Sequence, residues 1–494
     1  MRAHEAGALH ADGYGAPAWL ALPGDVNALD HRLWAGSVRK GDDGVLTVGG
    51  LSVTSLAERF GTALYVLDED DFRARTRAFV DAFAASFDRA GPGADVYYAG
   101  KAFLCTEVAR WVAAEGACLD TCSGAELATA LNAGLAPARI ALHGNNKSDA
   151  ELRRAVEVGL GRIVIDSVEE VARVADIAAE LDVVARVMLR VTVGVEAHTH
   201  SYIATAHEDQ KCGLSLAGGV AHEAARLALS RPELELRGLH SHIGSQIFAV
   251  DGFEVAARRL LGLHAQLVRE HGVELPEMDL GGGYGVAYIS EQHPLDPVEL
   301  ADGMADIVAK ECADLGVRVP RVSVEPGRAI AAPSTFTLYR VGTVKQVEVD
   351  GGQPRRYVAV DGGMSDNIRT ALYGADYSAT LASRASQAPP SLTRIVGKHC
   401  ESGDIVVMDE FLPADVRRGD LVAVPGTGAY CRSMASNYNH VPRPPVVAVR
   451  DGQARVVVRG ETEADLFRHD VGWDPHGWQP EDGSDLTMAP DSDR

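Results

Sequence analysis

The sequence predicts an α/β protein in which a parallel (β/α)8 barrel of the TIM type precedes a C-terminal all-β domain that an N-terminal segment completes. Between residues 96 and 325, eight short apolar runs alternate with amphipathic helical patterns, as in a closed parallel barrel. After Arg328 this alternation stops, and short β-rich runs separated by Gly, Pro and Asp follow. The change of rhythm indicates two domains.

Composition limits the partners and the compartment. The chain has 494 residues, 46% of them apolar, which is ample for two domains, and its formal net charge of −22 argues against nucleic acid or an anionic membrane as a partner. No apolar run approaches the length of a membrane span, and residues 1–27 lack the pattern of a secretory signal. The seven cysteines show no metal-ligand spacing. We therefore expect reduced thiols, a cytoplasmic location and no metal.

Two further segments flank the domains. Residues 1–40 are rich in Gly, Ala and Pro without a periodic pattern, so we expect much of this stretch to be loose. Two β-prone runs within 45–53 indicate a hairpin across Gly49-Gly50, which we expect to join the β domain. The C-terminal end is rich in Asp, Pro, Gly and Ser, which is typical of disorder. A further strand is expected at 63–67, ahead of the eight barrel strands. The expected segments are the N-terminal segment at 1–62, the barrel domain at 63–335, the β domain at 336–471 and the tail at 472–494.

The barrel strands follow the apolar runs. We expect them at 96–100, 118–121, 139–143, 162–166, 187–193, 236–242, 278–280 and 321–325. Polar or glycine residues, which are unusual for a core, stand at or near the carboxyl ends of these strands: Lys101, Asp120, His143, Asp166, Arg190, His242, Gly281 to Gly283 and Glu325. In a closed parallel barrel these ends share one rim, which is the active-site face. The sequence therefore predicts that these residues converge.

Lys101 follows a short β-prone run and Gly100. A lysine at the mouth of a buried strand can act as a Schiff-base nucleophile, because desolvation favours the neutral amine. Taken alone, the stretch favours a lysine whose amine extends to solvent. The complete ring of polar strand ends reverses that balance and indicates a functional amine.

The run Gly281-Gly-Gly-Tyr-Gly285 suits a phosphate better than a dinucleotide. The dinucleotide pattern G-x-G-x-x-G fits neither register, because Val286 or Tyr288 occupies its last position. Consecutive glycines at a strand end suit backbone amides that bind a single phosphate, with a plain turn as the alternative.

Two more strand ends suit a planar ring. Glu325 can hydrogen-bond a protonated ring nitrogen, with a surface ion pair at a Pro-Gly turn as the alternative. The flat ring of His242 can stack on a cofactor and Ser245 can donate to its phosphate, with a core histidine as the alternative. Together with Lys101 these residues describe a pyridoxal phosphate site. Because Glu325 keeps the ring protonated, the site favours loss of a carboxylate over racemisation.

At these residues the sequence resembles the barrel-type, or fold type III, pyridoxal phosphate decarboxylases, and among them the diaminopimelate decarboxylase family. The resemblance runs from about residue 45 to residue 440. The matching segments are Tyr98-Ala-Gly-Lys101-Ala, Leu119-Asp-Thr-Cys-Ser-Gly124, His143-Gly-Asn-Asn-Lys147, His240-Ser-His-Ile-Gly-Ser-Gln246, Asp279-Leu-Gly-Gly-Gly-Tyr-Gly285, Glu325-Pro-Gly-Arg328, Asn367-Ile-Arg-Thr-Ala-Leu-Tyr373, Cys400-Glu-Ser-Gly-Asp404 and Gly428-Ala-Tyr430.

The resemblance implies a role for each matching position. The implied catalytic residues are Lys101, which would form the Schiff base, His242, which would stack on the ring, Glu325, which would hold its nitrogen, Asp120 and Cys400. The implied cofactor-binding residues are Lys101, His242, Ser245, Gly281, Gly282, Gly283, Glu325, Gly327, Arg328 and Tyr430. The implied substrate-binding residues are Arg328, Arg369, Tyr373, Glu401 and Tyr430.

The resemblance also implies the reaction, which is decarboxylation of meso-2,6-diaminopimelate to L-lysine and carbon dioxide in bacterial lysine synthesis. It implies a homodimer in which Cys400 and Glu401 complete the neighbouring subunit's site. Two arginines and a glutamate match a substrate with a carboxylate and an ammonium at its far end. A solvated pair is the alternative for Arg369 and Glu401. One alternative is a related decarboxylase that acts on ornithine or arginine, which lack the distal carboxylate. Another is a catalytically silent homologue that binds a partner protein, which would be expected to lose Lys101.

Three positions depart from the family pattern: Thr370, Cys212 and the pair Lys398-His399. They put local packing in question rather than chemistry. The stretch 195–202 contains His198 and His200, which raises a metal alternative. Because no further ligands cluster nearby, a mobile loop over the substrate is favoured.

Overall fold

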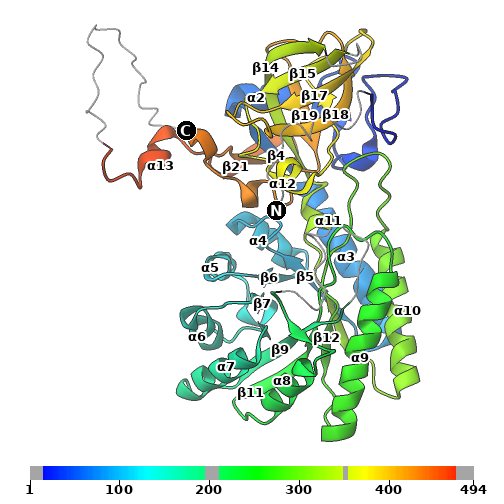
Figure 1. Cartoon of the computed structure of the whole chain (residues 1–494), viewed down its shortest axis with the longest axis vertical. Coiled ribbons are helices and arrows are strands. Elements are labelled where there is room, and N and C mark those ends of the chain that lie inside the picture. The colour runs from blue at the N-terminus through cyan, green and yellow to red at the C-terminus, as the bar shows by residue number, and fades with distance from the viewer. Residues whose placement is uncertain (1–14, 195–210, 349–353, 474–494) are drawn as a thin grey trace.

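The computed structural model describes residues 15–194, 211–348 and 354–473. Figure 1 shows a helix-covered barrel in cyan and green beneath a β-rich lobe in yellow and orange. Eight parallel strands close the barrel, because β8 pairs with β9 and β13 pairs with β5. This confirms the predicted fold class. The strands in ring order are β5 (Ala94–Ala99), β6 (Cys118–Thr121), β7 (Ile140–Leu142), β8 (Arg162–Ile165), β9 (Ala185–Thr192), β11 (Leu234–His240), β12 (Glu277–Asp279) and β13 (Arg321–Val324). A short strand, β10 (Leu214–Ser215), pairs with β9.

Helices separate the strands and cover the barrel. Three of them begin at a serine, Ser123, Ser148 or Ser167, whose side chain accepts a hydrogen bond from a backbone N–H three residues on. Each strand therefore runs through a short polar turn into its helix. The helices are α3 (Glu69–Ala90), α4 (Thr106–Ala114), α5 (Gly124–Asn132), α6 (Asp149–Glu157), α7 (Val168–Glu180), α8 (Val220–Leu229), α9 (Asp251–His271), α10 (Pro297–Leu315) and α11 (Arg328–Ala331). In the described part of the chain, no helix is long and apolar enough to cross a membrane.

The second lobe is a mainly antiparallel sheet with the order β18-β17-β15-β14-β4-β20-β21, to which β19 and β16 add. Its strands are β4 (Leu64–Asp68), β14 (Thr335–Glu348), β15 (Pro354–Val360), β16 (Thr380–Leu381), β17 (Pro390–Val396), β18 (Ile405–Pro413), β19 (Leu421–Pro425), β20 (Val446–Arg450) and β21 (Gln453–Val458). Two short helices, α12 (Arg369–Tyr373) and α13 (Glu463–Phe467), lie in the same part of the chain.

The strand expected at 63–67, within the bounds of the barrel domain, belongs to the second sheet. It is β4, which lies between β14 and β20 in the second sheet and is buried along its whole length. The barrel is already closed by eight other strands, so β4 finds its backbone partners in the β lobe. The chain therefore enters the β lobe first and passes through α3 into the barrel.

The N-terminal segment packs on the β lobe. The strands β2 (Leu46–Val48) and β3 (Leu51–Ser52) form the expected hairpin, and β1 (Arg39–Lys40) and α2 (Val53–Phe60) flank it. The amide of Leu46 donates to the carbonyl of Ala382 at 2.8 Å. The expectation that residues up to 40 are loose is wrong for the stretch around Trp34, whose buried ring lies 5.7 Å from that of Phe336. Residues 1–14 and most of the expected tail lie outside the described ranges.

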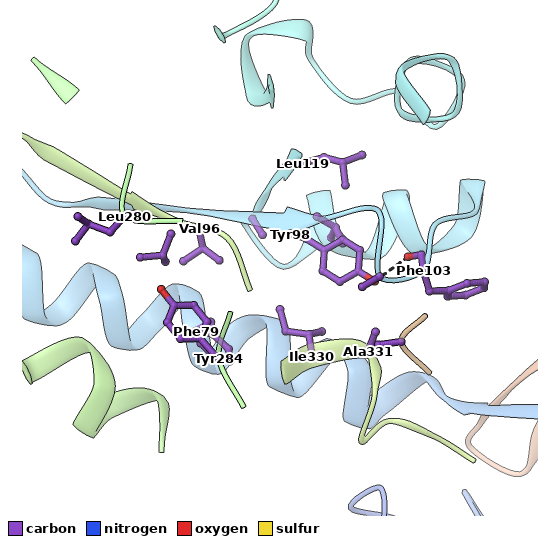
Figure 2. Packing of buried hydrophobic residues seen from close by; sticks show 14 of the residues in the cluster. Phe79, Val96, Tyr98, Phe103, Leu119, Leu280, Tyr284, Ile330 and Ala331 are labelled. Carbon is purple, nitrogen blue, oxygen red and sulfur yellow. Dashed lines mark hydrogen bonds between the residues drawn. The ribbon is translucent and has the colours of Figure 1, made fainter. Parts of the chain in front are cut away.

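Buried residues of the barrel core hold the turn that follows β5. Figure 2 shows the Tyr98 hydroxyl donating to the carbonyl of Phe103, at 2.7 Å, so that the chain around Lys101 is closed into a tight loop. Phe79 of α3 packs against Tyr284, with ring centroids 5.8 Å apart. These buried contacts hold the barrel core next to the turn that contains Lys101.

Candidate active site

A cavity of about 280 Å³ lies at the carboxyl ends of the barrel strands, where the barrel meets the β lobe. Most of the predicted site residues line it together: Lys101, His242, Ser245, Gly283, Glu325, Gly327, Arg328, Arg369, Tyr373 and Tyr430. Its remaining lining residues are Ala99 and Tyr284. The two lobes are joined here, because the Tyr430 amide donates to the carbonyl of Ala102 at 2.9 Å.

Lys101 is placed by a close contact between two strands. The Gly100 amide donates to the carbonyl of Asp120 at 2.9 Å, and a Cβ at Gly100 would lie 2.8 Å from that oxygen. Burial alone lowers the pKa of Lys101, but the neighbouring Tyr430, Cys122 and Glu325 raise that pKa above its ordinary value. The expectation of a neutral amine is therefore wrong for the protein by itself. Lys101 carries a proton that it must lose before it attacks a carbonyl.

Two carboxylates and two histidines gather beside Lys101, and we call Asp120, His143, His240 and Glu325 the carboxylate cluster. Nε2 of His143 lies 2.8 Å from Oδ1 of Asp120 and 3.3 Å from Oε1 of Glu325. Nε2 of His240 lies 3.1 Å from the same oxygen of Glu325. All four side chains are buried. Asp120 does not line the cavity but lies directly behind it.

The two carboxylates of this cluster differ in charge. Burial and the nearby Glu325 raise the pKa of Asp120 well above its usual range. Burial also raises the pKa of Glu325, but His143, His240 and Lys101 outweigh this and leave it well below its ordinary value. Burial lowers the pKa of His143 to about 4. The site therefore presents one ionised carboxylate, Glu325, beside a neutral Asp120.

Glu325 fits the ring nitrogen of pyridoxal phosphate. Glu325 lines the cavity and is ionised, with the Nε2 atoms of two histidines beside one of its oxygens. A buried anionic acceptor at the wall of a cavity suits a ligand that brings a proton. His242 lines the cavity, and its Nδ1 accepts a hydrogen bond from the Gly282 amide at 3.2 Å.

The glycine run is required by close packing. A Cβ at Gly281, Gly282 or Gly283 would lie 2.3, 2.1 or 2.3 Å from a backbone oxygen. The Gly281 amide donates to Oδ1 of Asp279 at 2.8 Å, and the Gly282 amide donates to His242. Of the three glycines only Gly283 lines the cavity, so the structure places Gly281 and Gly282 behind the wall rather than on it.

Two arginines that contact tyrosines also line the cavity, and we call Arg328, Arg369, Tyr288 and Tyr377 the arginine cluster. Arg328 donates to the Tyr288 hydroxyl at 2.7 Å and to Ser245 at 2.9 Å. Arg369 lies over the Tyr288 ring at 4.6 Å and donates to the Tyr377 hydroxyl. Neither arginine pairs with a carboxylate of the described chain. Arg369 is buried and Arg328 is half-buried, and cations without a counter-ion in such places suit an anionic ligand.

Cys400 and Glu401 do not reach this cavity. Both are exposed, and neither lines it. Their loop is ordered by Asp404, which accepts hydrogen bonds from the amides of His399 at 2.7 Å and Met364 at 2.6 Å. The two residues are therefore presented outward from a fixed loop.

The unusual residues have local partners. Thr370 donates to the carbonyl of Val406 at 3.0 Å and ties α12 to β18. His399 is buried and stacks on Tyr438, with centroids 5.6 Å apart. The carbonyl of Cys212 accepts from Thr192 at 2.9 Å. His198 and His200 lie outside the described residues, so the metal alternative has no structural counterpart to examine there.

Sequence reasoning gave no role to Tyr288, Tyr377 or His240, and it placed His143 on the active-site rim without a specific role. Tyr288 follows the glycine run and Tyr377 follows α12, both in loops without periodic pattern. A charge argument could have found the two tyrosines, because arginines at a cavity wall require neighbours that tolerate a guanidinium. His240 occupies a buried strand position and looks like core from the sequence alone.

A barrel rim that brings a lysine, a carboxylate suited to a ring nitrogen and glycines to one cavity defines a barrel-type pyridoxal-dependent enzyme. Consistent with this, residues 70–332 match the family model for the pyridoxal binding domain of pyridoxal-dependent decarboxylases. The chain is 55% identical over 453 residues to the diaminopimelate decarboxylase of Mycobacterium tuberculosis, covering 90% of this chain and 100% of that one. It is 43% identical over 436 residues to the enzyme of Bacillus subtilis, covering 88% and 97%.

The chain belongs to the diaminopimelate decarboxylase family. The fold agrees with that of the M. jannaschii diaminopimelate decarboxylase crystallised with L-lysine, at a TM-score of 0.82 and 30% identity over 88% of this chain and 98% of that one.

Proposed function

We propose that this protein uses pyridoxal phosphate to decarboxylate meso-2,6-diaminopimelate to L-lysine and carbon dioxide, the last step of bacterial lysine synthesis. The observation that carries the proposal is the arginine cluster, which adds two cations without a carboxylate partner in the described chain to a cavity that holds Lys101 and Glu325. The names of the relatives support it. All seven cysteines are free thiols, which agrees with work in the reducing cytoplasm.

The residues divide the work between them. When bound, pyridoxal phosphate supplies the electron sink for the pair left behind by the departing carboxylate. Lys101 would hold the cofactor covalently, His242 would lie against its ring and Glu325 would keep the ring nitrogen protonated. Gly283, Gly327, Tyr430 and Ser245 would hold its phosphate. Arg328 and Arg369 would bind the distal carboxylate, with Tyr373 beside them.

A substrate comparison tests this proposal. Purified holoenzyme is given meso-diaminopimelate, ornithine, arginine or lysine, and carbon dioxide release is measured. We expect diaminopimelate to react fastest, because it alone carries the distal carboxylate that two arginines would bind. Faster turnover of ornithine or arginine would overturn the substrate assignment and favour a related diamino-acid decarboxylase.

We infer further that two copies of the chain complete each other's sites. The only carboxylate that lines the described cavity is Glu325, which serves the ring, so the distal ammonium lacks an acidic partner. Glu401 is exposed on a loop ordered by Asp404 and is available to a second copy. In such a homodimer Cys400 and Glu401 would act in the neighbouring site.

Mixed subunits test the shared site. A hybrid of Lys101→Ala and Glu401→Ala chains contains one site with both residues intact, so mixing two inactive variants should restore part of the activity. The matched control mixes Lys101→Ala with the double variant Lys101→Ala/Glu401→Ala, which leaves no intact site. No recovery after demonstrated subunit exchange would contradict the shared site.

A further inference from the structure

Two histidines converge on a single oxygen of the carboxylate that serves the cofactor ring. Nε2 of His240 lies 3.1 Å and Nε2 of His143 lies 3.3 Å from Oε1 of Glu325. The two imidazoles also contact each other edge to face, with centroids 5.0 Å apart and planes at 70°. Each ring therefore limits the movement of the other.

We propose that His143 and His240 are positioning residues that hold Oε1 of Glu325 from behind, keep this carboxylate ionised and direct its other oxygen, Oε2, to the cofactor ring nitrogen. The proposal rests on pyridoxal phosphate as the cofactor. It assigns the histidines no contact with substrate, because both act through Glu325.

The arrangement joins three separate strands. His143 follows β7, His240 ends β11 and Glu325 follows β13, so the barrel fixes the three side chains relative to one another. A carboxylate on one strand end has free rotation about its side-chain bonds, and two contacts on one oxygen remove most of it. Preorganised acceptors are more effective than mobile ones, because they need no rearrangement when charge develops on the ring.

His143 has a second task, which is to separate two acids. Its Nε2 lies between Oδ1 of Asp120 and Oε1 of Glu325. Two carboxylates this close to one nitrogen cannot both be ionised cheaply in a buried site. Contact with two histidines favours the charge on Glu325, and Asp120, which contacts only one of them, keeps the proton. The ionised acid is then the one that faces the cofactor.

A plain core role for the histidines makes a different prediction. If they only fill space, an apolar side chain of similar size would serve as well. Leucine fills much of the space of histidine without a polar atom, whereas glutamine places a nitrogen near the position of Nε2. The pairs His143→Leu with His143→Gln and His240→Leu with His240→Gln therefore separate the two roles.

The protonation state of the cofactor's ring nitrogen is the quantity to measure. Apoprotein is reconstituted with cofactor labelled with ¹⁵N in the ring, and the ¹⁵N chemical shift and the cofactor dissociation constant are measured. In the leucine variants we expect the shift to move toward that of the unprotonated ring and the dissociation constant to rise. We expect kcat to fall on the order of 10-fold to 100-fold, as for other residues that act through a ligand's partner. KM should change little, and the glutamine variants should recover part of each loss.

Two controls make the outcome decisive. His264 is also buried, but it lies on α9 away from the cavity, so His264→Leu should leave the ¹⁵N shift unchanged. Wild-type protein that binds no cofactor at Lys101 would defeat the proposed function itself. Wild-type protein with a protonated ring, together with leucine variants that keep the same shift, would overturn the positioning role alone. Equal losses in the leucine and glutamine variants would also overturn it.

Discussion

The carboxylate cluster and the arginine cluster face the same cavity but are built in opposite ways. The carboxylate cluster comes from the barrel's own strand ends, and its charges are matched internally by histidines and Lys101. The arginine cluster joins Arg328 and Tyr288 of the barrel segment to Arg369 and Tyr377 beyond β15. Its cations are held by hydroxyls and aromatic faces. One side is prepared for a cationic ring and the other for an anionic substrate group.

The largest effect is expected from removing Lys101, which lines the same cavity as residues of both clusters. In Lys101→Ala we expect no covalent cofactor after borohydride reduction, and kcat lower by on the order of 10³-fold or more, because covalent attachment and proton transfer are both lost. Peptide mapping of the reduced wild type locates the label. A label on Lys147 would contradict the assignment. We expect none there, because Lys147 is already paired with Glu170 at 2.8 Å.

Removing one cation of the arginine cluster should separate substrate binding from cofactor binding. Loss of a forked contact to a buried anion costs about 2–5 kcal/mol. Arg369→Ala should therefore lower kcat/KM for diaminopimelate by on the order of 10² or more and leave cofactor affinity unchanged. Arg369→Lys keeps the charge without the fork and should recover only part of the loss. Weaker cofactor binding in both variants would show that the two sides are not independent.

A smaller effect is expected at the tyrosine between the arginines. Tyr288→Phe removes the hydroxyl that accepts from Arg328 but keeps the ring beneath Arg369. Because Ser245 still accepts from Arg328, we expect kcat/KM to fall by roughly 10-fold, the lower end of a hydrogen bond to a charged group. Steady-state kinetics on diaminopimelate measure this. An unchanged value would mean that the ring alone positions both arginines.

The same contrast explains what could be predicted from the sequence. The barrel strands were predictable because each is a short apolar run, and Lys101 and Glu325 stood out because polar residues are rare at such ends. The sheet to which β4 belongs could not be predicted, because its apolar pattern suits a central strand of any sheet. β17 is hard to recognise in the sequence, because Pro389-Pro390 at its start indicates a turn rather than a strand. Tyr288 and Tyr377 meet only through the tertiary fold, with ring centroids 5.0 Å apart.

Asp366 is a buried acid near α12 whose charge state can be tested. Asp366 accepts hydrogen bonds from the Tyr339 hydroxyl and, at 2.8 Å, from the Gly363 amide. Its neighbour Asn367 accepts from the Arg369 amide at 3.3 Å. Burial raises the pKa of Asp366 to about 7 from an ordinary value of 3.8. This carboxyl therefore stays protonated in the folded chain over a range in which the unfolded chain has lost the proton.

The sign of the pH effect follows from this difference. Below the ordinary value of 3.8 both states hold the proton, and the stabilisation is complete. As the pH rises from there to about 7, only the folded state keeps it, so the free energy of unfolding falls by up to ~1.4 kcal/mol per pH unit. Asp366→Asn cannot titrate and should remove this slope, with the smallest loss of activity among these variants. Urea unfolding of wild type and variant at pH 5, 6 and 7 measures the slope. Parallel curves would mean that Asp366 is ionised in the folded protein, as Glu325 is.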